Sequence, residues 1–72
     1  MVRKAVQHAG GRPMVARHMK VTSEAVRQWE EHGRIPAERV LELEALTRDE
    51  HGRPRVTRHD LRPDLYPEER AA

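Results

Sequence analysis

The sequence predicts a compact, all-α domain of four to five helices. Apolar side chains recur at helical spacing, Gly and Pro residues separate the periodic stretches, and residues 12–31 form a pattern of two short helices joined by a tight turn. The chain has 72 residues, no Cys and no Phe, so a thin aliphatic core must hold it together. We therefore expect one domain over residues 1–67 and a frayed tail at 68–72.

The first helix is predicted over residues 2–9, where apolar residues recur at i, i+3, i+4 and i+7. The Gly10-Gly11 pair ends this helix, because both residues can adopt backbone angles through which a helix cannot continue. The apolar positions are Val2, Ala5, Val6 and Ala9.

The second and third predicted helices make up the helix-turn-helix pattern. The second spans residues 12–19, and Thr22 is placed to cap the third, which runs to about Glu31 and is followed by a Gly stop at Gly33. Lys20 stands in the turn where Gly is expected, because such a turn commonly requires a left-handed backbone. The predicted inner residues are Val15, Ala16, Met19, Val21, Ala25, Val26 and Trp29.

Polar side chains that can hydrogen-bond remain on the outer side of the third helix, and they are Ser23, Glu24, Arg27 and Gln28. In a helix-turn-helix, residues near the N-terminus of the second helix contact base edges in the major groove. Gln28 suits adenine, and Arg27 suits guanine or a phosphate. Glu24 either accepts from cytosine N4 or only stabilises the start of its helix. The alternative for all four is ordinary solvent exposure.

Positive charge gathers on the same half of the chain. Residues 1–34 carry seven Lys and Arg against three acidic residues, a net charge of +4, whereas residues 35–72 carry seven against nine, a net charge of −2. Such an excess is typical of a phosphate-binding surface. Arg17 can equally pair with a neighbouring Glu. The predicted phosphate contacts are Arg12, Arg17, Lys20 and Arg34.

A fourth helix is predicted from Pro36 through Thr47. Its core stripe is expected to be Val40, Leu43 and Leu46, widened by Ala37, Leu41 and Ala45. The rest of its surface is expected to be Glu38, Arg39, Glu42 and Glu44.

The segment after the fourth helix combines charge with Gly and Pro, so residues 48–55 are predicted to form a mobile loop. A short helix is then predicted over 57–62, with Thr57 as its cap and Asp60 completing a capping box. Its apolar side is expected to be Leu61, Leu65 and Tyr66.

Two segments carry a resemblance to a known family. HAGGRPMVARHMKVTSEAVRQWEEHGRIPAERVLELEALT and VTRHDLRPDLYP resemble the small Cro/YdaS-type repressors of bacterial prophages, which are sometimes labelled antitoxins. The similarity covers residues 2–67. It implies a lambda-repressor-like domain that binds operator DNA, with Arg12 touching phosphate and the outer residues of the third helix facing the major groove. The chain departs from the family pattern at Lys20 and in its longer, more charged loop.

Other functional classes are disfavoured. The five His residues show no i, i+4 pair and there is no Cys, so we expect no metal and no cofactor. His59 beside Asp60 lacks a nucleophile, so we expect no catalysis. Trp29 can be viewed as a base-stacking platform, but its spacing from Val26 favours the core. No apolar run approaches the ~20 residues that span a bilayer, so we expect a cytoplasmic, nucleoid-associated protein.

The sequence therefore predicts a transcriptional regulator that binds double-stranded operator DNA, most simply a repressor acting as a homodimer on a palindromic site. A dimer is expected because one short helix offers few base contacts, whereas a useful operator needs about 4–10 kcal/mol of preference over random DNA. The fourth helix and residues 57–66 are candidates for the dimer surface; equally, Leu61, Leu65 and Tyr66 can pack on the core of their own chain. Alternatives are an antitoxin that binds a toxin partner and a non-specific nucleic-acid-binding module.

Overall fold

The structure, a computed structural model, describes residues 1–67. In this part of the chain the regular elements are helical, apart from one isolated bridge between Arg48 and Pro54. This confirms the predicted all-α class. The helices are α1 (Val2–His8), α2 (Arg12–Met19), α3 (Ser23–His32), the 3₁₀ turn η1 (Ala37–Arg39), α4 (Val40–Leu46) and α5 (Arg58–Leu61).

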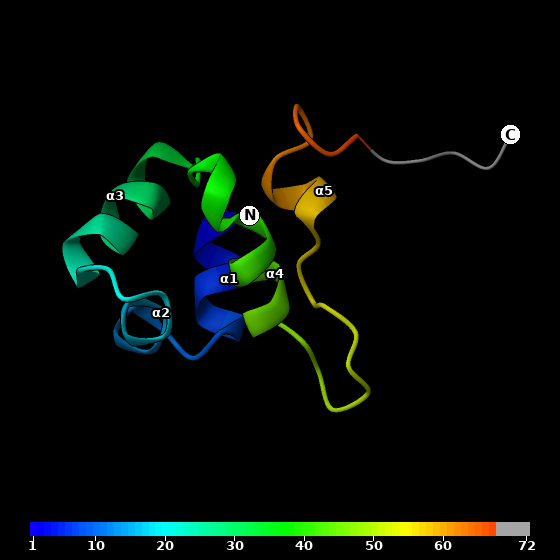
Figure 1. Cartoon of the computed structure of the whole chain (residues 1–72), viewed down its shortest axis with the longest axis horizontal. Helices are drawn as coiled ribbons and strands as arrows, with labels where there is room; N and C mark the ends of the chain where they lie inside the picture. Colours follow the sequence, from blue (N-terminus) through cyan, green and yellow to red (C-terminus); the bar gives the residue numbers. More distant parts are fainter. Residues whose placement is uncertain (68–72) are drawn as a thin grey trace, which may run out of the picture.

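The helices α1 and α4 lie side by side in the middle of the molecule, with α2 and α3 on one side and α5 on the other (Figure 1). The α2 and α3 pair forms the most extensive helix–helix contact, and both helices also touch α1. No helix within residues 1–67 is long and apolar enough to cross a membrane.

The core is built from aliphatic side chains contributed by every α-helix. Trp29 and Tyr66 are half-buried and pack against its edge, which agrees with the inward placement predicted for Trp29. Ile35, from the α3–η1 connection, and Val56, before α5, are fully buried, although no helical periodicity pointed to them. The other buried apolar residues are Val2, Ala5, Val6, Ala9, Val15, Ala16, Met19, Val26, Val40, Leu43 and Leu61.

The turn between α2 and α3 adopts the expected left-handed backbone, with Lys20 at φ 57° and ψ 42° in place of Gly. A side chain with a Cβ is strained there, at a cost of about 1 kcal/mol. The Thr22 hydroxyl then accepts a hydrogen bond from the Ala25 N–H at 3.0 Å, as predicted for the α3 cap. Gly33, also left-handed, ends α3.

The predicted orientation of α4 was wrong in part. Its inward positions are Val40, Leu43, Glu44 and Thr47, which follow i, i+3, i+4 and i+7, while Leu46 is only half-buried. Glu44 was expected on the solvent side. The residues expected to widen the core stripe, Ala37, Leu41 and Ala45, are instead exposed.

Hydrogen bonds from Arg58 explain why Glu44 lies on the inward side of α4. The Arg58 backbone N–H donates to Glu44 Oε2 at 2.6 Å, and the Arg58 guanidinium Nη2 donates to Glu44 Oε1 at 2.9 Å. Burial alone raises the pKa of Glu44, but these hydrogen bonds more than offset burial and hold the pKa below its ordinary value. The carboxylate therefore stays ionised while it holds α5 against α4.

The predicted loop at 48–55 contains a hydrogen-bonded turn. The Asp49 carboxylate accepts from the backbone N–H groups of His51 at 2.8 Å and Arg53 at 3.0 Å. The loop is closed at its base by Thr47, whose buried hydroxyl accepts from the Val56 N–H at 3.2 Å. This geometry fixes the start of the final segment.

The last described segment, residues 57–67, begins with the predicted capping box. In this box the side chains of Thr57 and Asp60 each accept a hydrogen bond from the other residue's backbone N–H. Of the residues on its apolar side, Leu61 is buried, Tyr66 is half-buried and Leu65 is 45% exposed. Arg62 is also buried and donates to the Ile35 carbonyl oxygen at 2.9 Å. The predicted frayed tail, residues 68–72, lies outside the described residues.

The strained turn gives a stability prediction. Lys20→Gly should raise the free energy of unfolding by about 1 kcal/mol, because Gly adopts the left-handed conformation without steric cost. Lys20→Ala removes the same charge and keeps the Cβ, so it should bring no such gain. Urea denaturation of both variants measures the difference, and equal stability would show that the turn is not strained.

Candidate nucleic-acid interface

The outer side of α3 carries the four residues that the sequence predicted to face DNA bases. Ser23 and Glu24 are exposed, and Arg27 and Gln28 are half-exposed. The opposite side of the helix is anchored by Val26, which is fully buried. The helix is therefore held to the core by one side and presents a polar side to solvent.

Three of these residues form one hydrogen-bonded group, which Glu31 extends; we call these four residues the α3 polar cluster (Glu24, Arg27, Gln28 and Glu31). Arg27 Nε donates to Glu24 Oε2 at 2.9 Å, and Arg27 Nη2 donates to the other carboxylate oxygen, Oε1. Gln28 Nε2 donates to the same Oε1 at 3.2 Å. Arg27 Nη1 also donates to Glu31. Ser23 is outside this group.

The charge state of the α3 polar cluster follows from these contacts. Hydrogen bonds from Arg27 and then from Gln28 lower the pKa of Glu24 from 4.5 to about 2. The pKa of Arg27 is raised, first by its hydrogen bond to Glu24. The single guanidinium of the cluster is thus bonded to the side chains of two acidic residues, Glu24 and Glu31, so attraction for phosphate must come from residues around it.

The predicted phosphate contacts divide into two pairs. Arg12 is ion-paired with Glu30 of α3, and Arg34 Nη2 lies 3.5 Å from Asp64 Oδ2. Arg17 and Lys20 are exposed and make no ion pair with any residue of the described range 1–67. They lie in α2 and in the turn that leads into α3. Arg17 therefore does not take up the neighbouring Glu that the sequence offered as an alternative.

Two acidic residues of α3 that pair with the predicted DNA-contacting arginines were missed. Glu31 was visible in principle, because Arg27 and Glu31 stand i, i+4 along one helix and Glu24 and Arg27 stand i, i+3. The contact of Glu30 with Arg12, eighteen positions earlier, had no local signal, because it depends on how α2 crosses α3.

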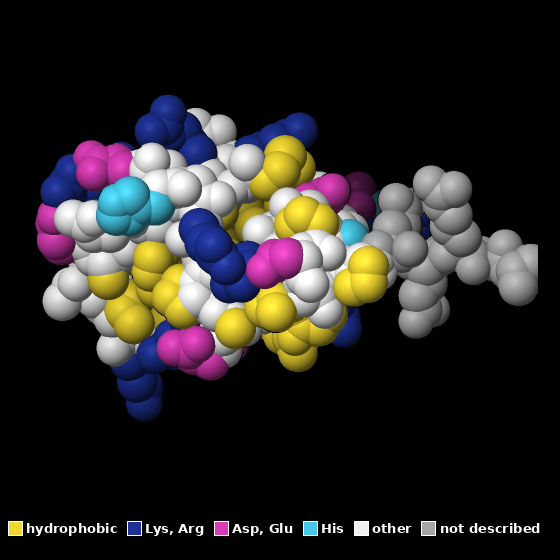
Figure 2. All heavy atoms as spheres, turned by 90° about the horizontal axis from the view of Figure 1, so that it is seen from above, with side chains coloured by type: hydrophobic (Ala, Val, Ile, Leu, Met, Phe, Trp, Pro, Cys, Tyr) yellow, Lys and Arg dark blue, Asp and Glu magenta, His cyan; other side chains and the backbone are white. Residues whose placement is uncertain are grey.

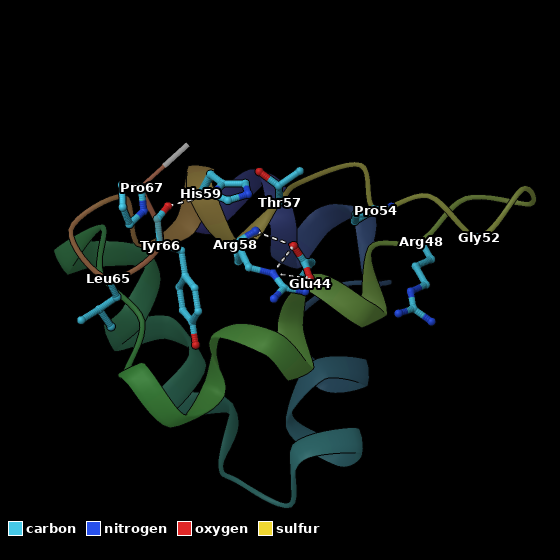
Figure 3. Close-up of a pocket in the computed structure, with 10 residues that line it drawn as sticks. All are labelled: Glu44, Arg48, Gly52, Pro54, Thr57, Arg58, His59, Leu65, Tyr66 and Pro67. Carbon is cyan, nitrogen blue, oxygen red and sulfur yellow. Dashed lines mark hydrogen bonds and ion pairs between the residues drawn. The ribbon is translucent and has the colours of Figure 1, made fainter. Parts of the chain in front are cut away.

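A polar hollow of about 660 Å³ lies beside α5, away from the outer side of α3 (Figure 3). Two of its charged groups are paired with each other: Arg58 binds Glu44, and the Arg58 guanidinium carbon lies 5.7 Å from the centre of the Tyr66 ring. His59 Nδ1 lies 2.8 Å from the Tyr66 carbonyl oxygen. Asp60, which the sequence placed beside His59, is occupied by the capping box. Within residues 1–67 no three His, Asp or Glu side chains come together as metal ligands would.

Comparisons with known proteins identify the family. The family described as "Bacterial toxin YdaS" matches residues 2–70, nearly the whole chain, while neither the curated proteins nor the solved structures gave a match. The match covers both segments on which the resemblance to Cro/YdaS-type proteins was based. The chain therefore belongs to the YdaS family.

Proposed function

We propose that this protein binds double-stranded DNA sequence-specifically and regulates transcription, with α3 lying in the major groove. The observation that carries the proposal is the two-sided character of α3, which is anchored by Val26 and directs hydrogen-bonding side chains outward. A major groove about 12 Å wide admits one α-helix. The three-residue turn after α2 leaves the N-terminal half of α3 accessible.

The roles of the outer residues follow from base chemistry. Gln28 can bond adenine in a bidentate manner, Arg27 can bond guanine O6 and N7, and Ser23 can bond either a base or a phosphate. Each well-formed base contact contributes about 1–3 kcal/mol of discrimination.

Phosphate contacts would fix the register of the protein on the duplex without reading sequence. Arg17 and Lys20 are the best placed for this role, because both are exposed, Arg17 in the last turn of α2 and Lys20 in the turn that leads into α3. Arg12 and Arg34 can contribute from the exposed parts of their side chains, which keep 43% and 67% exposure while ion-paired.

A homodimer on a palindromic operator would supply the specificity that one helix lacks, because two half-sites about one DNA turn apart double the base contacts. The exposed face of α4 supports such a dimer. Leu41 is 45% exposed there and is flanked by exposed Ala37 and Ala45. A dimer of this kind bound over a promoter would act as a Cro-like, prophage-type repressor.

A second candidate is a role in a toxin–antitoxin pair. The description of the family supports it, although that description names a toxin, whereas the sequence-based alternative was an antitoxin that binds a toxin. Hydrophobic side chains are exposed in small groups between charged ones on the face shown in Figure 2, and Leu65 is among the exposed hydrophobic residues of the chain. Under this candidate a protein partner would bind the chain, and DNA binding would serve autoregulation.

A gel-shift experiment separates these functions. At about 150 mM salt, where non-specific binding is weak, the protein should bind the region upstream of its own gene at least tenfold more tightly than a scrambled duplex. Equal affinity for the two duplexes would indicate a non-specific nucleic-acid-binding module. Absence of binding to either duplex would favour the candidate in which the chain binds a protein partner.

Two substitutions test the assignment of base and phosphate contacts. Gln28→Ala should lower discrimination at particular base pairs by about 1–3 kcal/mol, because a base contact is lost. Arg17→Ala should weaken binding to all sequences alike and reduce the salt slope by about one, because a phosphate contact is lost.

Arg48→Ala is the matched control for Arg17→Ala. It removes the same charge from the loop that lies away from α2 and α3 (Figure 1), so it should leave both the base preference and the salt slope unchanged. An unchanged base preference in Gln28→Ala would show that the outer side of α3 does not read bases.

A further inference from the structure

We propose that Glu24 reads no base itself but is a positioning residue that holds Arg27 and Gln28 in the conformations that read bases. It thereby sets sequence specificity while lowering affinity for DNA in general. This inference rests on the proposed function, because it assigns a role within the same DNA-reading surface.

The geometry at Glu24 supports positioning over direct reading. Both carboxylate oxygens already accept hydrogen bonds: Oε2 accepts from Arg27 Nε, and Oε1 accepts from Arg27 Nη2 and Gln28 Nε2. Three of the roughly four acceptor positions of the carboxylate are therefore filled from within the protein, which leaves at most one, on Oε2, for cytosine N4. The residue that looked from its chemistry like a cytosine reader is thus engaged by the two side chains beside it.

The partners of Glu24 keep the donors that base reading needs. A guanidinium has five N–H groups. The contacts with Glu24 and Glu31 use one on each of the three nitrogens of Arg27. One N–H therefore remains on each Nη, and two donors are what a bidentate contact to guanine O6 and N7 requires. Gln28 keeps its carbonyl oxygen and its second amide N–H, the pair that a contact to adenine requires.

The contacts with Glu24 order the side chains of Arg27 and Gln28 before DNA is bound. Arg and Gln are long side chains that lose much rotamer freedom when they engage a base. Glu24 restricts both in the free protein, so less freedom is lost at the moment of recognition, which is the general effect of preorganisation. A flexible Arg27 could instead follow any nearby phosphate, and phosphate contacts carry no sequence information.

The charge of Glu24 acts in the same direction. Since its pKa is about 2, the carboxylate stays ionised at neutral pH. An ionised carboxylate near the phosphate backbone opposes binding to every sequence, and it also neutralises part of the attraction that Arg27 would exert. Glu24 therefore disfavours random DNA, while the ordered Arg27 and Gln28 favour the correct bases.

The test compares Glu24→Gln with Glu31→Gln on a duplex that the wild-type chain selects from a randomised pool. Each variant removes one negative charge from the α3 polar cluster, so each should bind scrambled DNA a few-fold more tightly. Glu24→Gln should also lower the ratio of selected to scrambled affinity by about tenfold, the scale of one weakened base contact. Glu31→Gln should change that ratio less than twofold, because Glu31 touches only Nη1 of Arg27.

A readout without DNA tests the positioning step by itself. In ¹⁵N relaxation measurements, the Arg27 Nε–H and the Gln28 side-chain amide should be ordered in the free wild-type chain and mobile in Glu24→Gln. Circular dichroism confirms that both variants keep their helices. Side chains that are already mobile in the wild type would overturn the inference, whether or not the chain binds DNA.

The binding outcomes are equally decisive. An unchanged ratio in Glu24→Gln would overturn the inference, and so would a loss of preference confined to a single C·G pair, which would show that Glu24 reads cytosine directly. Failure of the wild-type chain to select any sequence would refute the proposed function and remove the specificity role of Glu24 with it. If the chain selects no sequence but Arg27 and Gln28 are still ordered by Glu24 in the relaxation measurements, the α3 polar cluster has a structural role only. If these side chains are mobile, the positioning step itself is absent.

Discussion

The placement of α3 depends on one carboxylate that joins three helices. The Glu30 side chain is only 5% exposed; it is ion-paired with Arg12 of α2, and Arg3 Nε of α1 lies 3.7 Å from its Oε2. A largely buried carboxylate is costly unless it is paired, and removing its partner is strongly destabilising. Because Val26 anchors the same helix by apolar burial, α3 is fixed both in depth and in rotation about its axis. Its outer side is therefore a defined surface.

The second half of the molecule is also held by buried polar side chains that are paired, next to a core without a fully buried aromatic ring. Glu44, Thr47 and Arg62 are buried polar residues, and each bonds a neighbouring segment. Within residues 1–67 every buried side-chain nitrogen or oxygen atom has a hydrogen-bond partner. Since a satisfied buried polar network specifies one arrangement of the chain, these contacts order the loop and α5 where aliphatic packing alone would be thin.

Local signals account for what could be predicted from the sequence. The Thr22 cap, the Thr57–Asp60 capping box and the stop at Gly33 act within a few residues, so the boundaries of α3 and α5 followed from them. The inward rotation of Glu44 could not be predicted, because a carboxylate amid polar neighbours signals solvent until its partner, fourteen positions later, is known. The four outer residues of α3 could be located from their spacing along one helix. The ion pair between Arg12 and Glu30 could not be predicted, because these residues lie eighteen positions apart.

Chemical-shift mapping tests most directly the proposed contact between DNA and the outer side of α3. When the ¹⁵N-labelled chain is titrated with a duplex from the region upstream of its gene, the largest shifts should fall on residues 23–28, with smaller shifts at Arg17 and Lys20. The hollow beside α5, around Arg58 and Tyr66, should be unaffected. Shifts concentrated in that hollow, with α3 unchanged, would contradict the account.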